Sequence, residues 1–341
     1  MRQPNQNPGR RVNHPRTGGG RGEIAGNTGN IVLMTKANER LYFVTERGVA
    51  SAQMADQIDP DGLNPALPMF IQRLDFEYGA NAIFIQRTLC TADALLDQTY
   101  LPEGFDRDAA FLIAYAAAED LAGVADTIAA LKAEEATTRA RLEAGAISVG
   151  IVPRTQNLKG RVEQAVSHLR SVQIGAMTLA EMFHPKARAN LPWASTLKEA
   201  INRTFPAGDE GIPFLEDQID VLERVANYRN AAVHPDHEKA FVTTDYDLRP
   251  DGVLIAPTVE VLHPRAPHQR QDTVQFLEQL VDQVSYSFEN LLALLANNSA
   301  RGGRRMLISF VAQSPELHRG SHFRWQSDWR EGMAPVLPVG A

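Results

Sequence analysis

The segment Val225–Asp236 brings together three side chains that could act on a phosphodiester, namely those of Arg229, Asn230 and His234. Asn230 and His234 are four residues apart, about 40° around an ideal helix, so their side chains share a face with Arg229 beside them. Pro235 ends the helix and lets the imidazole project from its end. An imidazole titrates near neutral pH, and a guanidinium matches phosphate oxygens. The three groups could therefore converge on one ligand.

Arg229 continues a stripe of apolar residues along the same predicted helix. The stripe comprises Leu215, Ile219, Leu222 and Ala226 and resumes at Val233. Burying an arginine on a packed face costs several kcal/mol of stability unless a carboxylate, a phosphate or a helix end compensates its charge. We therefore expect a compensating group close to Arg229. Glu119 and Asp120, which adjoin the apolar run of another helix, are candidate carboxylates.

The run Arg229-Asn230-Ala231-Ala232-Val233-His234 resembles the motif of the HEPN superfamily, the nucleotide-binding proteins of higher eukaryotes and prokaryotes. That motif consists of an arginine, a polar residue, a short spacer and a histidine near the end of a helix. The resemblance directly covers about a dozen residues, and the order of long helices around them is compatible with it. It implies a mainly α protein with an HEPN-like up-and-down helical bundle.

The resemblance also implies metal-independent RNA cleavage without a cofactor. In active members the histidine is a general acid and base, and the arginine stabilises charge on the phosphate. Asn230 would orient the phosphate or the imidazole. Two copies commonly face each other, so a homodimer is expected, and a toxin or defence role with a protein regulator is implied. Some HEPN toxins carry a tyrosine two residues after the histidine, where this chain has Asp236, so the arrangement of that branch is not implied.

Two alternatives to catalysis remain open for the motif. An inactive HEPN module could use the same residues to bind a nucleotide or a protein partner. In the second alternative, the arginine and histidine only complement the dipole at a helix C-terminus, and the asparagine caps its carbonyl groups.

Three other clusters could also carry function. Arg161 and His168 form a looser arginine–histidine pair within a predicted helix, where exposed positions are favoured. The cluster His234, Asp236, His237 and Glu238 offers metal ligands, but its spacing favours a solvated turn. The C-terminal residues His318, His322, Phe323, Arg324, Trp325, Trp329 and Arg330 either stack single-stranded nucleic acid or pack tryptophans onto the core.

Composition limits the class of protein. The 341 residues include 34 Lys and Arg against 41 Asp and Glu, and a net charge of −7 argues against a broad surface for duplex nucleic acid. The lone cysteine, Cys90, lies in an apolar stretch and is expected in the core of a protein from a reducing compartment. No secretory leader or membrane span is predicted, so a cytoplasmic location is expected.

The sequence predicts four regions that position the motif. Residues 1–22 form a basic arm with the composition of disorder, and 23–65 are ambiguous, with a short strand and then a helix favoured between Ile31 and Gln57. Residues 66–298 form the helical domain with a β-hairpin inserted at about 240–262, and 299–341 form an extension with one candidate strand, Met306–Val311. The helices expected in the domain are Pro68–Tyr100, Asp106–Ala144, Asn157–Phe183, Ala194–Arg203, Pro213–Val233 and Gln271–Asn297.

Overall fold

The structure, a computed structural model, describes residues 28–64, 66–98, 101–145, 151–183, 193–204, 208, 211–298, 306–310 and 325–329. The predicted basic arm and most of the C-terminal extension lie outside these residues. Within the extension, strands β10 (Met306–Phe310) and β11 (Trp325–Trp329) pair antiparallel and lie against helices α9 and α4. None of the described helices is both long and apolar enough to cross a membrane.

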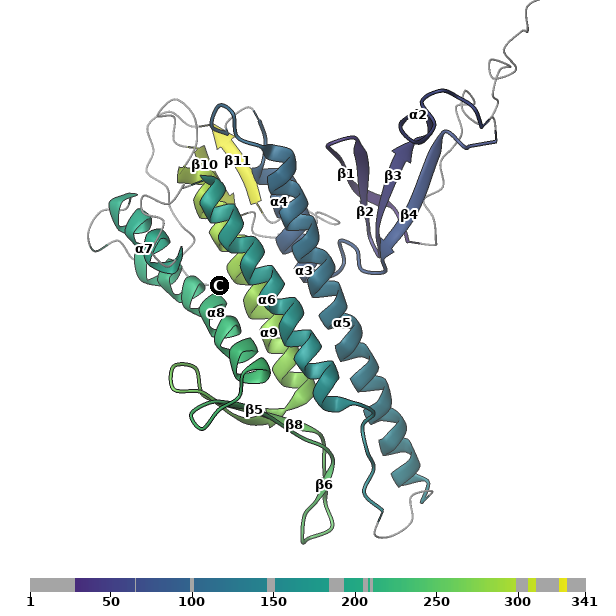
Figure 1. Cartoon of the computed structure of the whole chain (residues 1–341), viewed down its shortest axis with the longest axis vertical. Helices are drawn as coiled ribbons and strands as arrows, with labels where there is room; N and C mark the ends of the chain where they lie inside the picture. The colour runs from purple at the N-terminus through teal and green to yellow at the C-terminus, as the bar shows by residue number, and fades with distance from the viewer. Residues whose placement is uncertain are drawn as a thin grey trace, which may run out of the picture.

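Four long helices form the body of the molecule, and successive ones run in opposite directions along its long axis (Figure 1). Helix α6 packs against α5, α8 and α9, while α8 and α5 each also contact α9. A shorter helix, α7, lies against α8. Their bounds are α5 Arg107–Glu143, α6 Leu158–Phe183, α7 Trp193–Thr204, α8 Gly211–Val233 and α9 Thr273–Asn298. The five corresponding predictions are confirmed to within a few residues.

Local sequence accounts for the longest of these helices. The carboxylate of Asp106 caps α5 by accepting a hydrogen bond from the Ala109 amide at 2.9 Å, and Gly145 follows the helix with φ of +66°. Small residues let α6 approach closely. A Cβ added at Gly123 would lie 3.3 Å from the ring of His168. The core between the helices is apolar, with Tyr228, Phe276, Phe288 and Leu169 among its largest fully buried side chains.

The N-terminal region is a four-stranded antiparallel sheet in the order β1-β2-β3-β4. Its elements are β1 Ile31–Ala37, β2 Arg40–Thr45, β3 Val49–Met54, the short helix α2 Ala55–Ile58, and β4 Phe70–Phe76. The expectation of one strand and then a helix before Gln57 is therefore wrong, because three strands precede a single helical turn. Strands β1 and β2 meet at Asn38, which adopts a positive φ of 52° suited to a tight hairpin.

The predicted helix Pro68–Tyr100 is also wrong in its first half. Phe70 and Leu74 are spaced like residues on a helix face, but this segment pairs as β4 with β3. Only the second half is helical, as α3 (Ile83–Ile85), the π-helix η2 (Gln86–Cys90) and α4 (Thr91–Leu95). Cys90 is completely buried there, as expected, and burial raises the pKa of its thiol to about 12.

A second small sheet closes the end of the bundle where α8 terminates (Figure 1). Strand β5 (Ala240–Thr244) pairs antiparallel with β8 (Thr258–Leu262), which agrees with the predicted hairpin. The hairpin tip holds the short pair β6 (Asp247–Leu248) and β7 (Leu254–Ile255). An additional strand that the sequence did not indicate, β9 (His268–Asp272), pairs with β8 and leads directly into α9.

Candidate functional site

Helix α8 presents different residues to each of its neighbours. Gln218 accepts a hydrogen bond from Ser287 of α9 at 3.0 Å, and the Tyr228 ring lies 5.8 Å from that of Phe276. These contacts define the side that faces α9. Asp220 forms an ion pair with Lys198 of α7 at 2.7 Å. Arg229 follows Gln218 by eleven residues, about 20° of helix rotation, and its charge also acts on Arg170 of α6, so it lies where α8 meets both α9 and α6.

The apolar stripe that leads to Arg229 is buried at its start and emerges at its end. Leu215, Ile219 and Leu222 are at most 1% exposed, whereas Val233 is 44% exposed. Arg229 lies between them and is half-buried. In the described part of the chain its guanidinium has no acidic partner. The expected carboxylates do not supply one, because Glu119 is exposed and the Asp120 carboxylate instead forms a hydrogen bond with Nδ1 of His168 on α6, 2.8 Å away.

A second arginine lies near enough to Arg229 for their charges to interact. Arg170 of α6 is half-buried and also lacks an acidic partner among the described residues. Its own burial, followed by the positive charge of Arg229, lowers the pKa of Arg170 from its usual value. A guanidinium group nevertheless stays charged near neutral pH in proteins. Within the described part of the chain, these two neighbouring positive charges on α6 and α8 have no carboxylate paired with them.

Asn230 lies in the last turn of α8 next to Arg229, and His234 directly follows the last residue of the helix. Asn230 is half-buried, and its carbonyl accepts the His234 amide at 2.9 Å. The imidazole of His234 is exposed and has no partner among the described residues. The loop after it is fixed by Asp236, whose carboxylate accepts from the amides of Glu238 and Lys239 at 2.9 and 3.0 Å. The structure thus places the three predicted residues within six consecutive positions at an open helix end.

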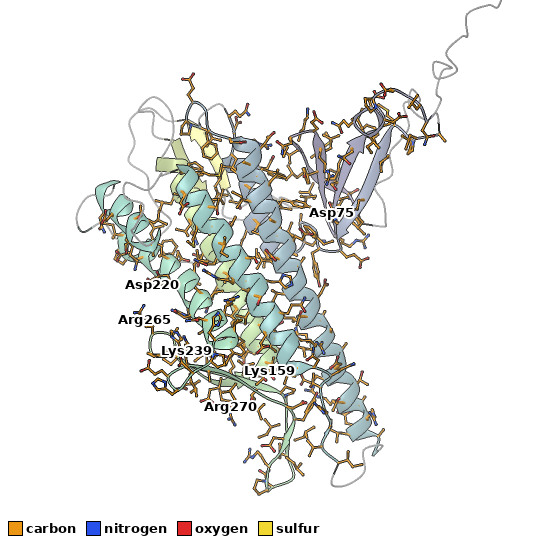
Figure 2. All side chains as sticks on the ribbon, in the orientation of Figure 1. Asp75, Lys159, Asp220, Lys239, Arg265 and Arg270 are labelled. Atoms are coloured by element: carbon orange, nitrogen blue, oxygen red, sulfur yellow. The ribbon has the colours of Figure 1, made fainter. Side chains whose placement is uncertain are left out.

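Further positive charge borders this helix end. Lys239 and Arg265 lie beside the lower end of α8 (Figure 2). His263 is close to both, since burial and then the charges of Lys239 and Arg265 lower its pKa. Lys239 is paired with Asp236 at 3.3 Å, so of these two charges that of Arg265 lacks an acidic partner among the described residues.

The looser arginine–histidine pair on α6 does not form a common site. Arg161 pairs with Glu134 at 2.6 Å, and His168 contacts Asp120, so each side chain is held separately by α5. Neither is fully exposed, contrary to expectation, because α5 covers that side of α6. Among the residues that the structure describes, no group of three or more His, Cys, Asp or Glu side chains could hold a metal ion.

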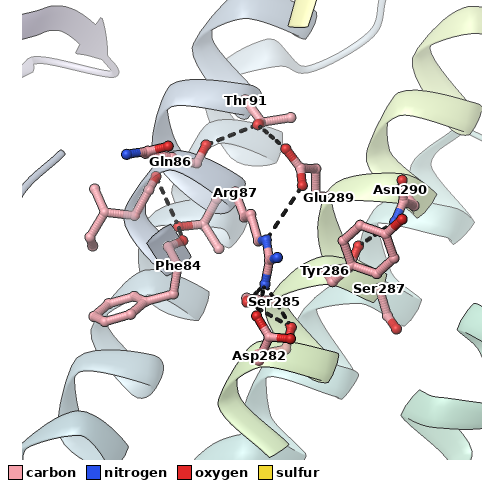
Figure 3. Close-up of polar contacts among 12 residues, drawn as sticks. Phe84, Gln86, Arg87, Thr91, Asp282, Ser285, Tyr286, Ser287, Glu289 and Asn290 are labelled. Carbon is pink, nitrogen blue, oxygen red and sulfur yellow. Dashed lines mark hydrogen bonds and ion pairs between the residues drawn. The ribbon is translucent and has the colours of Figure 1, made fainter. Parts of the chain in front are cut away.

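A network of charged side chains between η2 and α9 was not predicted from the sequence (Figure 3). Arg87 contacts Asp282 at 2.6 Å and Ser285 at 3.1 Å, and its Nε lies 3.6 Å from Glu289. Thr91 donates to Glu289 at 3.3 Å. The one available signal was a charged residue in each of two apolar helical runs. Because the guanidinium of Arg87 has acidic partners, this network joins η2 to α9 and offers no ligand site.

Arg170 is the residue near the motif that sequence reasoning missed. The sequence feature that could have identified Arg170 is its position in a helical stripe with the apolar residues Val166 and Leu169, which are completely buried. The chain matches no protein-family model, no curated protein sequence and no solved structure. The function of the site must therefore be argued from its own chemistry.

Proposed function

We propose that this protein is a metal-independent endoribonuclease of the HEPN type, with Arg229, Asn230 and His234 as its active-site residues. The observation that carries the proposal is the surroundings of Arg229. A half-buried guanidinium without an acidic partner in the described chain lies five residues before an exposed imidazole. A phosphate group would compensate the charge that the protein leaves uncompensated.

The roles of the residues follow from their chemistry. His234 would remove the proton of a ribose 2′-hydroxyl, whose oxygen then attacks the adjacent phosphorus. The bond from phosphorus to the 5′-oxygen breaks, and a protonated imidazole supplies the proton that this oxygen needs. The products are a 2′,3′-cyclic phosphate and a 5′-hydroxyl. Arg229 would stabilise the charge that develops on the phosphate, while Asn230 orients it.

Two features support the HEPN-type assembly that the motif implies. The four long helices alternate in direction, and the motif ends α8 at the edge of the bundle (Figure 1). His234 and the 44% exposed Val233 leave this helix end accessible to a second copy. We therefore propose a homodimer in which two motifs face each other, acting as a toxin or defence effector under a protein regulator.

The test compares His234→Ala with His237→Ala in an RNA-cleavage assay that contains EDTA. His237 is a matched control because it lies three residues further along the same loop and its side chain is 89% exposed. Removing the general acid and base should lower the cleavage rate by on the order of 10²-fold or more. His237→Ala should cleave like the wild type, with cyclic-phosphate ends.

Two outcomes would count against the enzyme. One is an activity that EDTA abolishes, and the other is equal activity in the two histidine variants. If the wild type binds RNA or nucleotide but leaves RNA intact, the protein is instead a non-catalytic HEPN-like binding module. Arg229 and Asn230 would then bind the ligand without taking part in a reaction.

A further inference from the structure

Arg170 lies on the side of α6 that faces away from α5. His168 contacts Asp120 of α5, and Gly175 lies against Ile113 of the same helix. Arg170 follows His168 by two residues, about 200° of helix rotation, so it points to the opposite side. That side includes the neighbour α8, with which α6 is in contact. Arg229 of α8 lies near enough to Arg170 for their charges to interact, and the two helices are in contact.

Two arginines placed in this way repel each other in the empty protein. Neither has an acidic partner in the described part of the chain, and both are half-buried, so water screens their charges only in part. Such an arrangement lowers stability unless a ligand compensates it. A phosphate group can accept hydrogen bonds from two guanidinium groups at once through different oxygens.

We propose that Arg170 and Arg229 form a two-arginine clamp for one phosphate group of the RNA backbone. Arg170 is then a substrate-binding residue contributed by α6, which the motif on α8 does not contain. The RNA in this proposal rests on the proposed function, whereas the phosphate site rests on the two arginines. Free phosphate and an RNA phosphodiester share the chemistry, so each is tested as a separate ligand.

The first experiment measures thermal melting of the full chain in inorganic phosphate, against chloride of equal ionic strength. A ligand that binds only the folded state raises the melting temperature with its concentration. The melting temperature of the wild type should rise with phosphate concentration. Arg170→Gln and Arg229→Gln should lose that gain, and Arg170→Gln should melt at or above the wild type when phosphate is absent, because a repulsion is removed.

The matched control is Arg139→Gln. Arg139 is 70% exposed on α5 and pairs with Glu135 at 3.0 Å, far along the chain from the clamp. This variant should keep the full response to phosphate. The proposal is overturned if Arg170→Gln responds to phosphate like the wild type, or if it melts well below the wild type in chloride, as loss of a structural contact would predict.

The second experiment uses a 2′-O-methyl oligoribonucleotide, which cannot form the cyclic product. Its dissociation constant should rise about tenfold in Arg170→Gln, since a charge-assisted hydrogen bond is lost, and less in Arg170→Lys, which keeps the charge. Arg139→Gln should bind like the wild type. An unchanged affinity in Arg170→Gln would limit the site to free phosphate and contradict the RNA clamp.

The two proposals fail in different ways. If phosphate and RNA binding depend on both arginines but no His234-dependent cleavage occurs, the clamp stands and the ribonuclease does not. If RNA is cleaved with the expected dependence on His234 while Arg170→Gln binds and cleaves normally, the ribonuclease stands and the clamp does not.

Discussion

Arg229 and Arg87 are both held within the helical bundle, but their surroundings differ in charge. Arg87 is 11% exposed at its side chain and lies between Asp282 and Glu289. Arg229 lies near Arg170, and no described acid pairs with it. The same residue type therefore stabilises the fold at one position and leaves a charge to be compensated at the other.

This difference predicts that Arg229→Gln keeps the fold. The substitution strands no carboxylate and removes a repulsion, so the free energy of unfolding should stay within about 1 kcal/mol of the wild type. The cleavage rate should fall because on the order of 3–4 kcal/mol of transition-state stabilisation is lost. Urea unfolding beside the RNA assay checks both. Unfolding at neutral pH would show that Arg229 is part of a structural ion pair.

At the scale of elements, the π-helix η2 positions Arg87 against α9. Its wider turn is an irregularity between α3 and α4, where Thr91 donates to the Gln86 carbonyl at 2.9 Å. From this turn Arg87 donates to both the carboxylate and the backbone carbonyl of Asp282 (Figure 3). The network fixes the short helices to the C-terminal helix of the bundle.

Arg87→Met should therefore be strongly destabilising, unlike Arg229→Gln. The side chain of Glu289 is 1% exposed, so loss of the arginine leaves a buried carboxylate without a compensating charge. The free energy of unfolding should fall by about 3–5 kcal/mol as a result. The double variant Arg87→Met/Glu289→Gln should recover part of the lost stability. Asp282→Asn is the control, since Asp282 is 63% exposed and should lose at most about 1 kcal/mol. Urea unfolding of all three variants measures the differences, and an equal loss in each would contradict the assignment.

At the scale of the whole molecule, the N-terminal sheet docks on α5. Arg107 reaches Thr35 and the Lys36 carbonyl of β1, each at 2.6 Å, and the Asn38 amide donates to Asp108 at 2.6 Å. Near the other end of the sheet, Tyr78 donates to Asp126 of α5 at 3.0 Å. These polar contacts flank a cluster of aromatic rings and fix the sheet to the bundle.

The Tyr78 contact predicts a dependence of stability on alkaline pH. Burial and then the bond to Asp126 raise the pKa of Tyr78 to about 12, against about 10 in the unfolded chain. Between these values the unfolded state has lost the phenolic proton and the folded state has kept it, so stability falls as pH rises. The stability difference between wild type and Tyr78→Phe should shrink over this window. Urea unfolding at several pH values tests it, and parallel curves would refute it.

The sequence alone determined the long helices and the position of the motif. Periodic apolar residues, the cap at Asp106 and the stop at Pro235 act within a few residues of chain, so α5, α6, α8 and α9 could be predicted closely. The same local logic placed Arg229, Asn230 and His234 at one helix end. Helical hydrogen bonds join residues four apart, and a short window of sequence contains both partners.

Only the tertiary structure decided the sheets and the partners of the charges. A strand takes its hydrogen bonds from another segment, so the helix-like spacing in β4 was overridden by pairing with β3. In the same way, periodicity indicated that Arg229 faces a packed neighbour but not which residue stands opposite. The order and rotation of packed helices brought Arg170 to Arg229 and Asp120 to His168, because contacts between helices depend on the whole bundle.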